Sequence, residues 1–360
     1  MKQKQSEADA TVVVGTYDGG LLGFGLDGAQ RFGYAPHVGC VKAVHCNQAG
    51  KLATGATDNS VKLFDLARSV ELGELQEHED SVACLQYWQN TLVTGGSDGQ
   101  VCIWRCGDYE LLLKFKGHKA AVTCLAIHPS GRMMASAGRD QRLQLWDLTR
   151  GTSAAHLTME GLEALEWSPD GERIAALSPK ELTAVEVKDP SSAASFKDAS
   201  SAGFMRVSFT AVAWLSPHLL ALGDAKGAVR VLRHGAELVE VCQLPETEKG
   251  TPAPRVKALL ARDGRLLVGM SAGQVEVWGF ILAKAAPEFE KLRVVDTKSR
   301  LTCLTAWFQA AADAGLKKKQ PESKKLVKPA AKAGKTGKAA KTSKAGKAPA
   351  KLVGKKQKTP

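Results

Sequence analysis

One short motif recurs seven times, and its spacing constrains the fold more than any other feature of the sequence. Each copy is an apolar residue, any residue, a small residue and a second apolar residue. The copies are Val41–Val44, Val82–Leu85, Val122–Leu125, Leu162–Leu165, Phe209–Val212, Val256–Leu259 and Leu301–Leu304. Their starts lie 41, 40, 40, 47, 47 and 45 residues apart. This is the period of a four-stranded propeller blade, so the sequence predicts an all-β, seven-bladed propeller.

The third position of the motif is restricted to Ala or Cys. Its occupants are Ala43, Cys84, Cys124, Ala164, Ala211, Ala258 and Cys303. In a radial fold the first strand of each blade lines the central channel, where blades converge and only small side chains fit. The eight cysteines include no CxxC pair and no cluster with zinc spacing, and the nearest two, Cys102 and Cys106, bracket a predicted strand. We therefore expect free thiols and no metal site.

The two ends of the repeat array predict how the ring closes. Residues 11–35 have the pattern of three strands with no first strand before them, whereas 300–307 is a first strand with nothing after it. The simplest arrangement lets 300–307 pair with the N-terminal blade, so that no edge stays open. We thus expect a propeller over 11–308, a disordered N-terminus over 1–10 and a disordered basic tail over 309–360.

Blades three and four carry polar residues at matching places, and these residues resemble the hydrogen-bonded tetrad of a WD40 repeat. The two sets are His78, Thr94, Asp98 and Trp104, and His118, Ser136, Asp140 and Trp146. Blade two keeps Thr54 and Asp58, with Phe64 in place of Trp. Buried polar groups of this kind need partners, so we expect structural and not catalytic roles. Blades five to seven depart from the pattern; Pro179-Lys180, for example, has no turn Asp.

Three longer stretches resemble the p21-activated protein kinase-interacting protein 1-like family of WD-repeat proteins. They are residues 127–151, the WSPDGE at 167–172 and the closing RLTCLTAW at 300–307. The similarity runs through about 11–308 and is sharpest in blades two to four. It implies a nucleolar scaffold of large ribosomal subunit assembly that works in rRNA processing and pre-60S maturation. Its implied partners are proteins of the pre-60S particle and rRNA. Regulation of a p21-activated-type kinase is an alternative, and a chromatin adaptor is another.

Loops that carry the turns between second and third strands, and loops that enter the first strands, lie on one face of a WD propeller by resemblance to that fold. We therefore expect Glu79, Ser97, Lys119 and Arg139 to share a rim, where protein partners commonly dock. A rim that is merely solvated remains the alternative.

The excess positive charge of the chain is confined to its C-terminal tail. Residues 316–360 contain 16 Lys, no Arg and one acid, Glu322, whereas the other 315 residues carry 33 basic and 36 acidic side chains. Gly and Pro between the charges predict disorder. The Lys clusters predict a nuclear or nucleolar address and loose, sequence-blind binding to rRNA phosphates; a solubility tail is the alternative. The clusters are Lys317, Lys318, Lys319, Lys324 and Lys325, and Lys355, Lys356 and Lys358.

The sequence gives no support for an enzyme. Gly334-Lys335-Thr336 matches the end of a P-loop, but Pro329 stands at the upstream Gly position. No nucleophile and base or paired carboxylates occur in a supporting context. The polar N-terminus and the lack of a long apolar run predict a soluble, intracellular protein. We expect no cofactor, no membrane and no small-molecule substrate.

Overall fold

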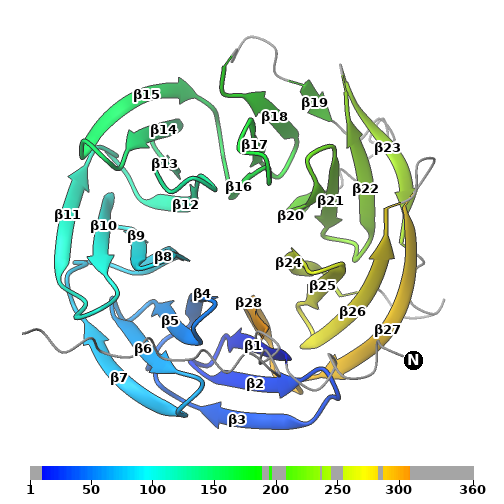
Figure 1. The fold of residues 1–360 in the computed structure, drawn as a ribbon, viewed down its shortest axis with the longest axis horizontal. Coiled ribbons are helices and arrows are strands. Elements are labelled where there is room, and N and C mark those ends of the chain that lie inside the picture. The colour runs from blue at the N-terminus through cyan, green and yellow to red at the C-terminus, as the bar shows by residue number, and fades with distance from the viewer. Residues whose placement is uncertain are drawn as a thin grey trace, which may run out of the picture. The chain divides into compact units, whose positions relative to one another are not determined.

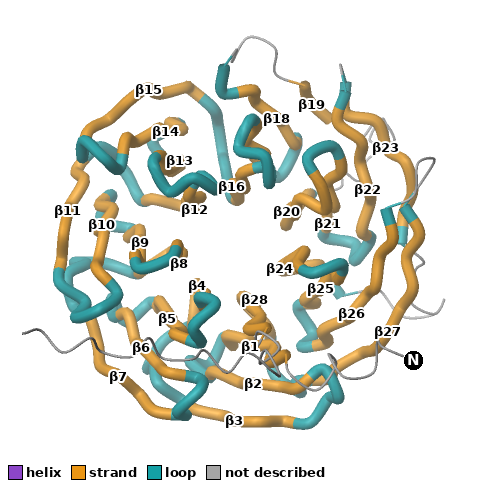
Figure 2. Tube along the Cα trace, viewed as in Figure 1, coloured by secondary structure: helices purple, strands orange, loops and turns teal. Residues whose placement is uncertain are grey.

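Seven four-stranded antiparallel sheets surround one axis in a computed structural model of the chain (Figure 1). The first strand of each sheet lies nearest the axis and the last lies at the periphery (Figure 1). The structure describes residues 10–188, 194–196, 208–235, 237–244, 254–282 and 287–308, and these contain strands and loops but no helix (Figure 2). The seven-bladed β-propeller expected from the repeat spacing is thereby confirmed.

The chain divides into two compact units, Met1–Ala312 and Asp313–Pro360, and every described residue belongs to the first. The N-terminal residues 1–9 and the basic tail 309–360 lie outside the described residues. Their disorder therefore remains a prediction.

Blades one to four contain the following strands. Blade one has β28 (Leu301–Phe308), β1 (Ala10–Thr16), β2 (Leu21–Gly25) and β3 (Gln30–Tyr34). Blade two has β4 (Val41–Cys46), β5 (Lys51–Ala56), β6 (Val61–Asp65) and β7 (Val70–Leu75). Blade three has β8 (Val82–Trp88), β9 (Thr91–Gly96), β10 (Gln100–Arg105) and β11 (Leu111–Lys116). Blade four has β12 (Val122–Ile127), β13 (Met133–Gly138), β14 (Arg142–Asp147) and β15 (Thr152–Thr158).

Blades five to seven repeat the pattern. Blade five has β16 (Ala164–Trp167), β17 (Arg173–Leu177), β18 (Leu182–Glu186) and β19 (Ala194–Phe196). Blade six has β20 (Phe209–Ser216), β21 (Leu219–Asp224), β22 (Val229–His234) and β23 (Leu238–Gln243). Blade seven has β24 (Val256–Arg262), β25 (Arg265–Met270), β26 (Gln274–Ile281) and β27 (Glu288–Asp296).

The ring closes where the C-terminal strand β28 meets the N-terminal strand β1. The two strands pair in antiparallel register from Ala10 opposite Phe308 to Gly15 opposite Cys303. Blade one is therefore built from both ends of the propeller. Ala10, which we expected to precede the propeller, is the first residue of β1 and is buried, because Phe308 offers it a pairing partner.

In five of the seven joints between neighbouring blades, the first motif residue makes a close contact with a glycine of the preceding blade. A Cβ atom added at Gly15 would lie 2.8 Å from Val41 Cγ1, and one added at Gly55 would lie 2.6 Å from Val82 Cγ1. At Gly95 the same atom would also meet the Cys84 sulfur at 2.7 Å. The small third residue of the motif thus has a more specific cause than crowding at the axis. This small residue lies opposite a backbone position that is already in close contact with the next blade.

Threonine side chains add a polar bond to three of these joints. Each lies second in its motif, and its hydroxyl hydrogen bonds to the carbonyl of the first motif residue of the next blade. The bonds run from Thr123 to Leu162 (2.8 Å), from Thr210 to Val256 (2.7 Å) and from Thr302 to Val41 (2.6 Å). The third of these holds the closing strand β28 against blade two with the same contact that is used elsewhere in the ring.

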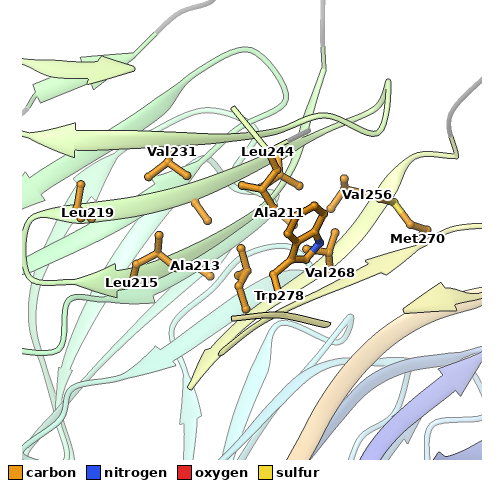
Figure 3. Close-up of a cluster of buried hydrophobic side chains, with 13 residues drawn as sticks. Ala211, Ala213, Leu215, Leu219, Val231, Leu244, Val256, Val268, Met270 and Trp278 are labelled. Atoms are coloured by element: carbon orange, nitrogen blue, oxygen red, sulfur yellow. The ribbon is translucent and has the colours of Figure 1, made fainter. Parts of the chain in front are cut away.

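Apolar side chains fill the space between blades. In the largest such cluster, Ala211 and Ala213 of β20 pack with Val268 and Trp278 of blade seven (Figure 3). Val256, the first motif residue, lies in the same cluster. The core is therefore a series of wedges between sheets, and it leaves the loops at both ends of the ring to carry function.

Candidate functional site

A buried chain of hydrogen bonds fixes one end of blade four. Trp146 donates its indole N–H to Ser136 Oγ at 2.8 Å, and Ser136 Oγ lies 2.8 Å from His118 Nε2. His118 Nδ1 lies 3.0 Å from Asp140 Oδ1. An ionised Asp140 accepts from Nδ1, so the network assigns the proton of a neutral His118 to that nitrogen. Every polar atom along this path has a partner, which is the condition for burying it.

Blade three repeats this network with the second predicted set of residues. Trp104 donates to Thr94 Oγ1 at 3.1 Å, His78 Nε2 lies 2.9 Å from the same hydroxyl, and His78 Nδ1 lies 3.1 Å from Asp98 Oδ2. The side chains of His78 and Asp98 are almost completely buried. The structure therefore brings together all eight tetrad residues as two sets of four.

Blade two completes its network with a histidine that the sequence reasoning missed. His37 Nδ1 lies 3.0 Å from Asp58 Oδ2, and its Nε2 lies 2.8 Å from Thr54 Oγ1. The distance between the histidine and the repeated motif would have identified it. His37 stands four residues before Val41, just as His78 precedes Val82 and His118 precedes Val122. Phe64 closes this site without a hydrogen bond to Thr54.

The charges of these networks follow from their partners. Burial alone would raise the pKa of Asp140, but the amide N–H of Lys119 and the ring of His118 donate to it and lower that pKa overall. Burial likewise opposes a lowered pKa at Asp58, where Ser60 and His37 donate. At His37, burial lowers the pKa more than Asp58 raises it. The blade-two pair is thus a carboxylate beside a neutral imidazole, which suits a structural role.

The tetrads also position the four residues of the predicted partner rim, Glu79, Ser97, Lys119 and Arg139. Glu79 and Lys119 follow the tetrad histidines, and their amide N–H groups donate to Asp98 and Asp140, each at 3.0 Å. Ser97 and Arg139 precede the tetrad aspartates, and their amides donate to the carbonyls of Ser81 and Ala121, each at 2.8 Å. The structure therefore holds all four backbones rigidly in the loops at one face of blades three and four.

The side chains of the partner rim point away from these backbone bonds. Glu79, Lys119 and Arg139 are exposed, and Ser97 is half-buried. Within the described part of the chain, neither Lys119 nor Arg139 has an ion-pair partner. Their backbones are held by hydrogen bonds, and their charged side chains are exposed to a partner.

Blade five has lost its tetrad, and a groove lies in the corresponding place. Thr158 stands four residues before Leu162, where the other blades carry His, and Ala176 stands at the place of Ser136. The groove measures about 620 Å³, and Thr158, Ala176 and the turn residues Pro179 and Lys180 are among its walls. Thr158 and Ala176 are smaller than the His and Ser of the tetrad, and the neighbouring side chains do not fill the space that they leave.

Blade seven has replaced the tetrad with an ion pair. Trp278 donates its indole N–H to Glu276 Oε2 at 3.0 Å. Lys291 bonds to the other oxygen of Glu276 at 2.5 Å and lies over the Trp278 ring, 5.3 Å from its centre. The tryptophan is thus kept while its partners change.

The described ranges offer neither a metal site nor a membrane-spanning helix. No group of three or more His, Cys, Asp or Glu side chains there is arranged to hold a metal ion. No helix of sufficient length and apolarity to cross a membrane occurs in the same residues. The cysteines are all free. The Lys clusters at 317–325 and 355–358 lie outside the described residues. Their role in targeting or RNA binding therefore stays a prediction.

Comparisons with known proteins agree with this fold. The family model described as "WD domain, G-beta repeat" matches residues 69–105 and 109–147, which run from the outer strand of blade two to the third strand of blade four. The solved structure titled "Structure of U3-55K" superposes with a TM-score of 0.61 at 14% identity, covering 73% of this chain and 84% of that chain. At this identity the likeness concerns the fold alone.

Relatives named for kinase interaction are similar over most of the chain. The p21-activated protein kinase-interacting protein 1-like protein of Gallus gallus is 28% identical over 84% of this chain and 81% of its own length. The p21-activated protein kinase-interacting protein 1 of Homo sapiens is 28% identical over 84% of this chain and 78% of its own. The Shk1 kinase-binding protein 15 of Schizosaccharomyces pombe is 31% identical over 39% of this chain and 43% of its own. This chain is therefore a seven-bladed WD-repeat propeller protein and a homologue of the p21-activated protein kinase-interacting protein 1-like proteins.

Proposed function

We propose that the protein is a non-enzymatic scaffold of 60S ribosomal subunit assembly that acts in rRNA processing and pre-60S maturation in the nucleolus. The observation that carries this proposal is the division of charge along the chain. The propeller-bearing 315 residues are close to neutral, whereas residues 316–360 carry a net charge of +15. A neutral body has little long-range attraction for RNA, but a Lys-rich tail attracts phosphates without regard to sequence.

The partner rim supplies the selectivity that such a tail lacks. Lys119 and Arg139 are exposed, lack ion-pair partners in the described structure, and are anchored through their own amide N–H groups. Because their backbones are held in place, the two charged side chains present a fixed pair of starting points to a partner, which favours a specific protein contact. We infer that the rim chooses a pre-60S protein and that the tail raises its local concentration near rRNA.

A second function is favoured by the names of the relatives. Proteins called p21-activated protein kinase-interacting protein 1 and Shk1 kinase-binding protein 15 are similar to this chain. The same rim is then the surface that binds and restrains a protein kinase. The two functions differ in what accompanies the protein, namely precursor rRNA in the first and a kinase without rRNA in the second.

Purification of the full-length protein from cells tests both the function and the site. The double variant Lys119→Glu/Arg139→Glu is expected to lose most of the precursor rRNA of the large subunit that accompanies the wild type. Arg132→Glu is the control, because Arg132 is exposed in the same blade but lies in the turn between β12 and β13, at the opposite face. Equal rRNA recovery with both variants would remove the rim from the proposal.

Truncation after Gly315 separates the tail from the rim. We expect the truncated protein to stay folded, to accumulate less in the nucleolus and to bind single-stranded RNA weakly. Each phosphate neutralised contributes about −0.7 to the slope of log K against log salt, so the full-length protein should show the steeper slope. Equal slopes and equal nucleolar signal would reduce the tail to a solubility element.

A further inference from the structure

Four basic side chains from three consecutive blades gather near the ring axis, on the face that carries the partner rim. Lys257 is the second residue of β24 and Lys42 the second of β4, while Arg255 and Arg300 precede β24 and β28. Blades seven, one and two supply β24, β28 and β4, so these strands are neighbours around the axis (Figure 1). We call Lys42, Arg255, Lys257 and Arg300 the axial basic cluster.

The charges of the axial basic cluster act on one another. Burial lowers the pKa of Lys257, and the charges of Arg255, Arg300 and Lys42 lower it further, against an opposing effect of Glu163. None of the four has an ion pair with a carboxylate among the described residues. Like charges held together without an ion-paired carboxylate disfavour the free protein, and a bound anion relieves that repulsion.

Two exposed apolar side chains lie on the same face as the axial basic cluster. Tyr17 is 54% exposed and Val38 is 100% exposed. Their backbones are fixed, because the amide of Tyr17 donates to the carbonyl of Arg300 at 3.0 Å and that of Val38 donates to Asp58 at 3.2 Å. The guanidinium of Arg300 lies over the Tyr17 ring, 5.0 Å from its centre. Aromatic and arginine side chains presented together are typical of energetically important positions in protein interfaces.

The places of Tyr17 and Val38 in their blades identify them as members of the same face. Val38 follows the tetrad histidine His37, as Glu79 and Lys119 follow theirs. Tyr17 precedes a turn aspartate, as Ser97 and Arg139 do. The face therefore has a charged sector at blades three and four and a mixed basic and apolar sector at blades one, two and seven.

We propose that this second sector binds an acidic polypeptide segment with interspersed apolar residues, whose carboxylates meet the axial basic cluster and whose apolar side chains cover Tyr17 and Val38. A carboxylate matches the planar fork of an arginine and neutralises a lysine at a point. Nucleic acid fits less well, because a phosphate backbone carries no apolar side chain that could cover the exposed Val38. This inference goes beyond the proposed function, since it concerns a different surface and holds for whichever assembly the propeller serves.

Binding of a short fluorescent peptide that alternates glutamate with leucine tests the proposal on the full-length protein. The double variant Lys42→Glu/Arg300→Glu is expected to weaken binding at least about tenfold. The control is Lys180→Glu/Lys226→Glu, which makes the same change of net charge at exposed turns on the same face, in blades five and six. The basic tail is present in all three proteins, so its contribution cancels in the comparison.

A third variant tests the apolar part of the sector. Val38→Ser removes a fully exposed side chain, so folding is unaffected, and it is expected to weaken binding of the glutamate–leucine peptide several-fold. A peptide with glutamine in place of glutamate should bind none of the proteins. Equal binding by the cluster variant and the control variant would overturn the proposal, as would equal binding of the glutamine peptide. So would a polyuridylate strand that depends on Lys42 and Arg300 more strongly than the peptide does.

Discussion

The ring of His45 in β4 accepts a hydrogen bond through Nδ1 from the backbone amide of Tyr87 in the next blade, at 3.2 Å. Two other blades make the same bond with different side chains. Gln86 accepts from the amide of Ile127 at 2.8 Å, and Glu166 accepts from the amide of Trp214 at 3.1 Å. The same acceptor position between neighbouring blades is thus filled by an imidazole, a carboxamide and a carboxyl group. These three groups differ in their protonation as the pH changes.

His45 is expected to make the protein sensitive to acid. Burial and the charge of Arg262 lower its pKa to about 4. A histidine whose pKa is lower in the folded than in the unfolded state stabilises the fold above about pH 6.5, and that stability is lost as the pH falls towards 4. His45→Gln, which copies Gln86, should match the wild type at neutral pH and lose less stability between about pH 6.5 and 4. Denaturant unfolding across this range is the measurement, and parallel curves would contradict the assignment.

Glu166 is expected to have the opposite effect at alkaline pH. Burial raises its pKa to about 8, although the Trp214 amide opposes the rise. Because the folded protein holds this proton more tightly than the unfolded chain, stability falls as pH rises from about 4.3 to about 8. Glu166→Gln should therefore be the more stable protein above pH 8 and come closest to the wild type at about pH 4, near the unfolded pKa. If Glu166→Gln is less stable than the wild type at both pH values, the carboxyl group has another role.

The tetrad of blade four predicts an asymmetry between two turn aspartates. Asp140→Ala leaves His118 Nδ1 and the amide of Lys119 without their acceptor, which should cost about 1–3 kcal/mol of stability. Asp18 occupies the matching turn of blade one and is exposed, and no histidine contact holds it. Asp18→Ala should change stability by about 0.5 kcal/mol or less. Thermal melting of both variants decides the matter, and equal losses would mean that the buried network is not what stabilises the turn.

The threonine bonds allow the closing joint to be compared with joints inside the continuous chain. Thr302→Val removes the bond to Val41 that holds β28, and Thr123→Val and Thr210→Val remove the equivalent bonds elsewhere. If the ring is closed in solution, all three should cost about 1 kcal/mol. A ring that opens at β28 would show no loss for Thr302→Val while the other two variants are destabilised. Chemical denaturation of the three proteins provides the comparison.

Much of this architecture could be predicted, because the repeated motif marks where the innermost strand of each blade lies along the chain. The seven motifs place β4, β8, β12, β16, β20, β24 and β28 correctly, since each motif combines an apolar residue that packs against the preceding blade with a small residue that lies opposite the second strand of its own blade. His37 was not predicted, because blade two has Phe64 in place of the tetrad Trp and Pro36-His37 stands in a loop with no other tetrad residue beside it. The constant distance from histidine to motif would have revealed it.

Other features could not be predicted, because they depend on how blades meet. Nothing in a single blade indicates that His45, Gln86 and Glu166 are equivalent, since the amide that each one binds belongs to the next blade. The sequence does indicate that blade five lacks a tetrad, but whether neighbouring side chains fill the space is decided by packing. The axial basic cluster likewise joins Lys42 to three residues more than 200 positions further along the chain, and only the closed ring brings them together.

Sedimentation of nuclear extract from cells that express the tagged full-length protein is the most direct test of the proposed function. We expect the protein to migrate with precursors of the large ribosomal subunit and to move to the top of the gradient after ribonuclease treatment. Recovery of the protein only near the top of an untreated gradient, together with a protein kinase and without precursor rRNA, would contradict the proposed role in ribosome assembly.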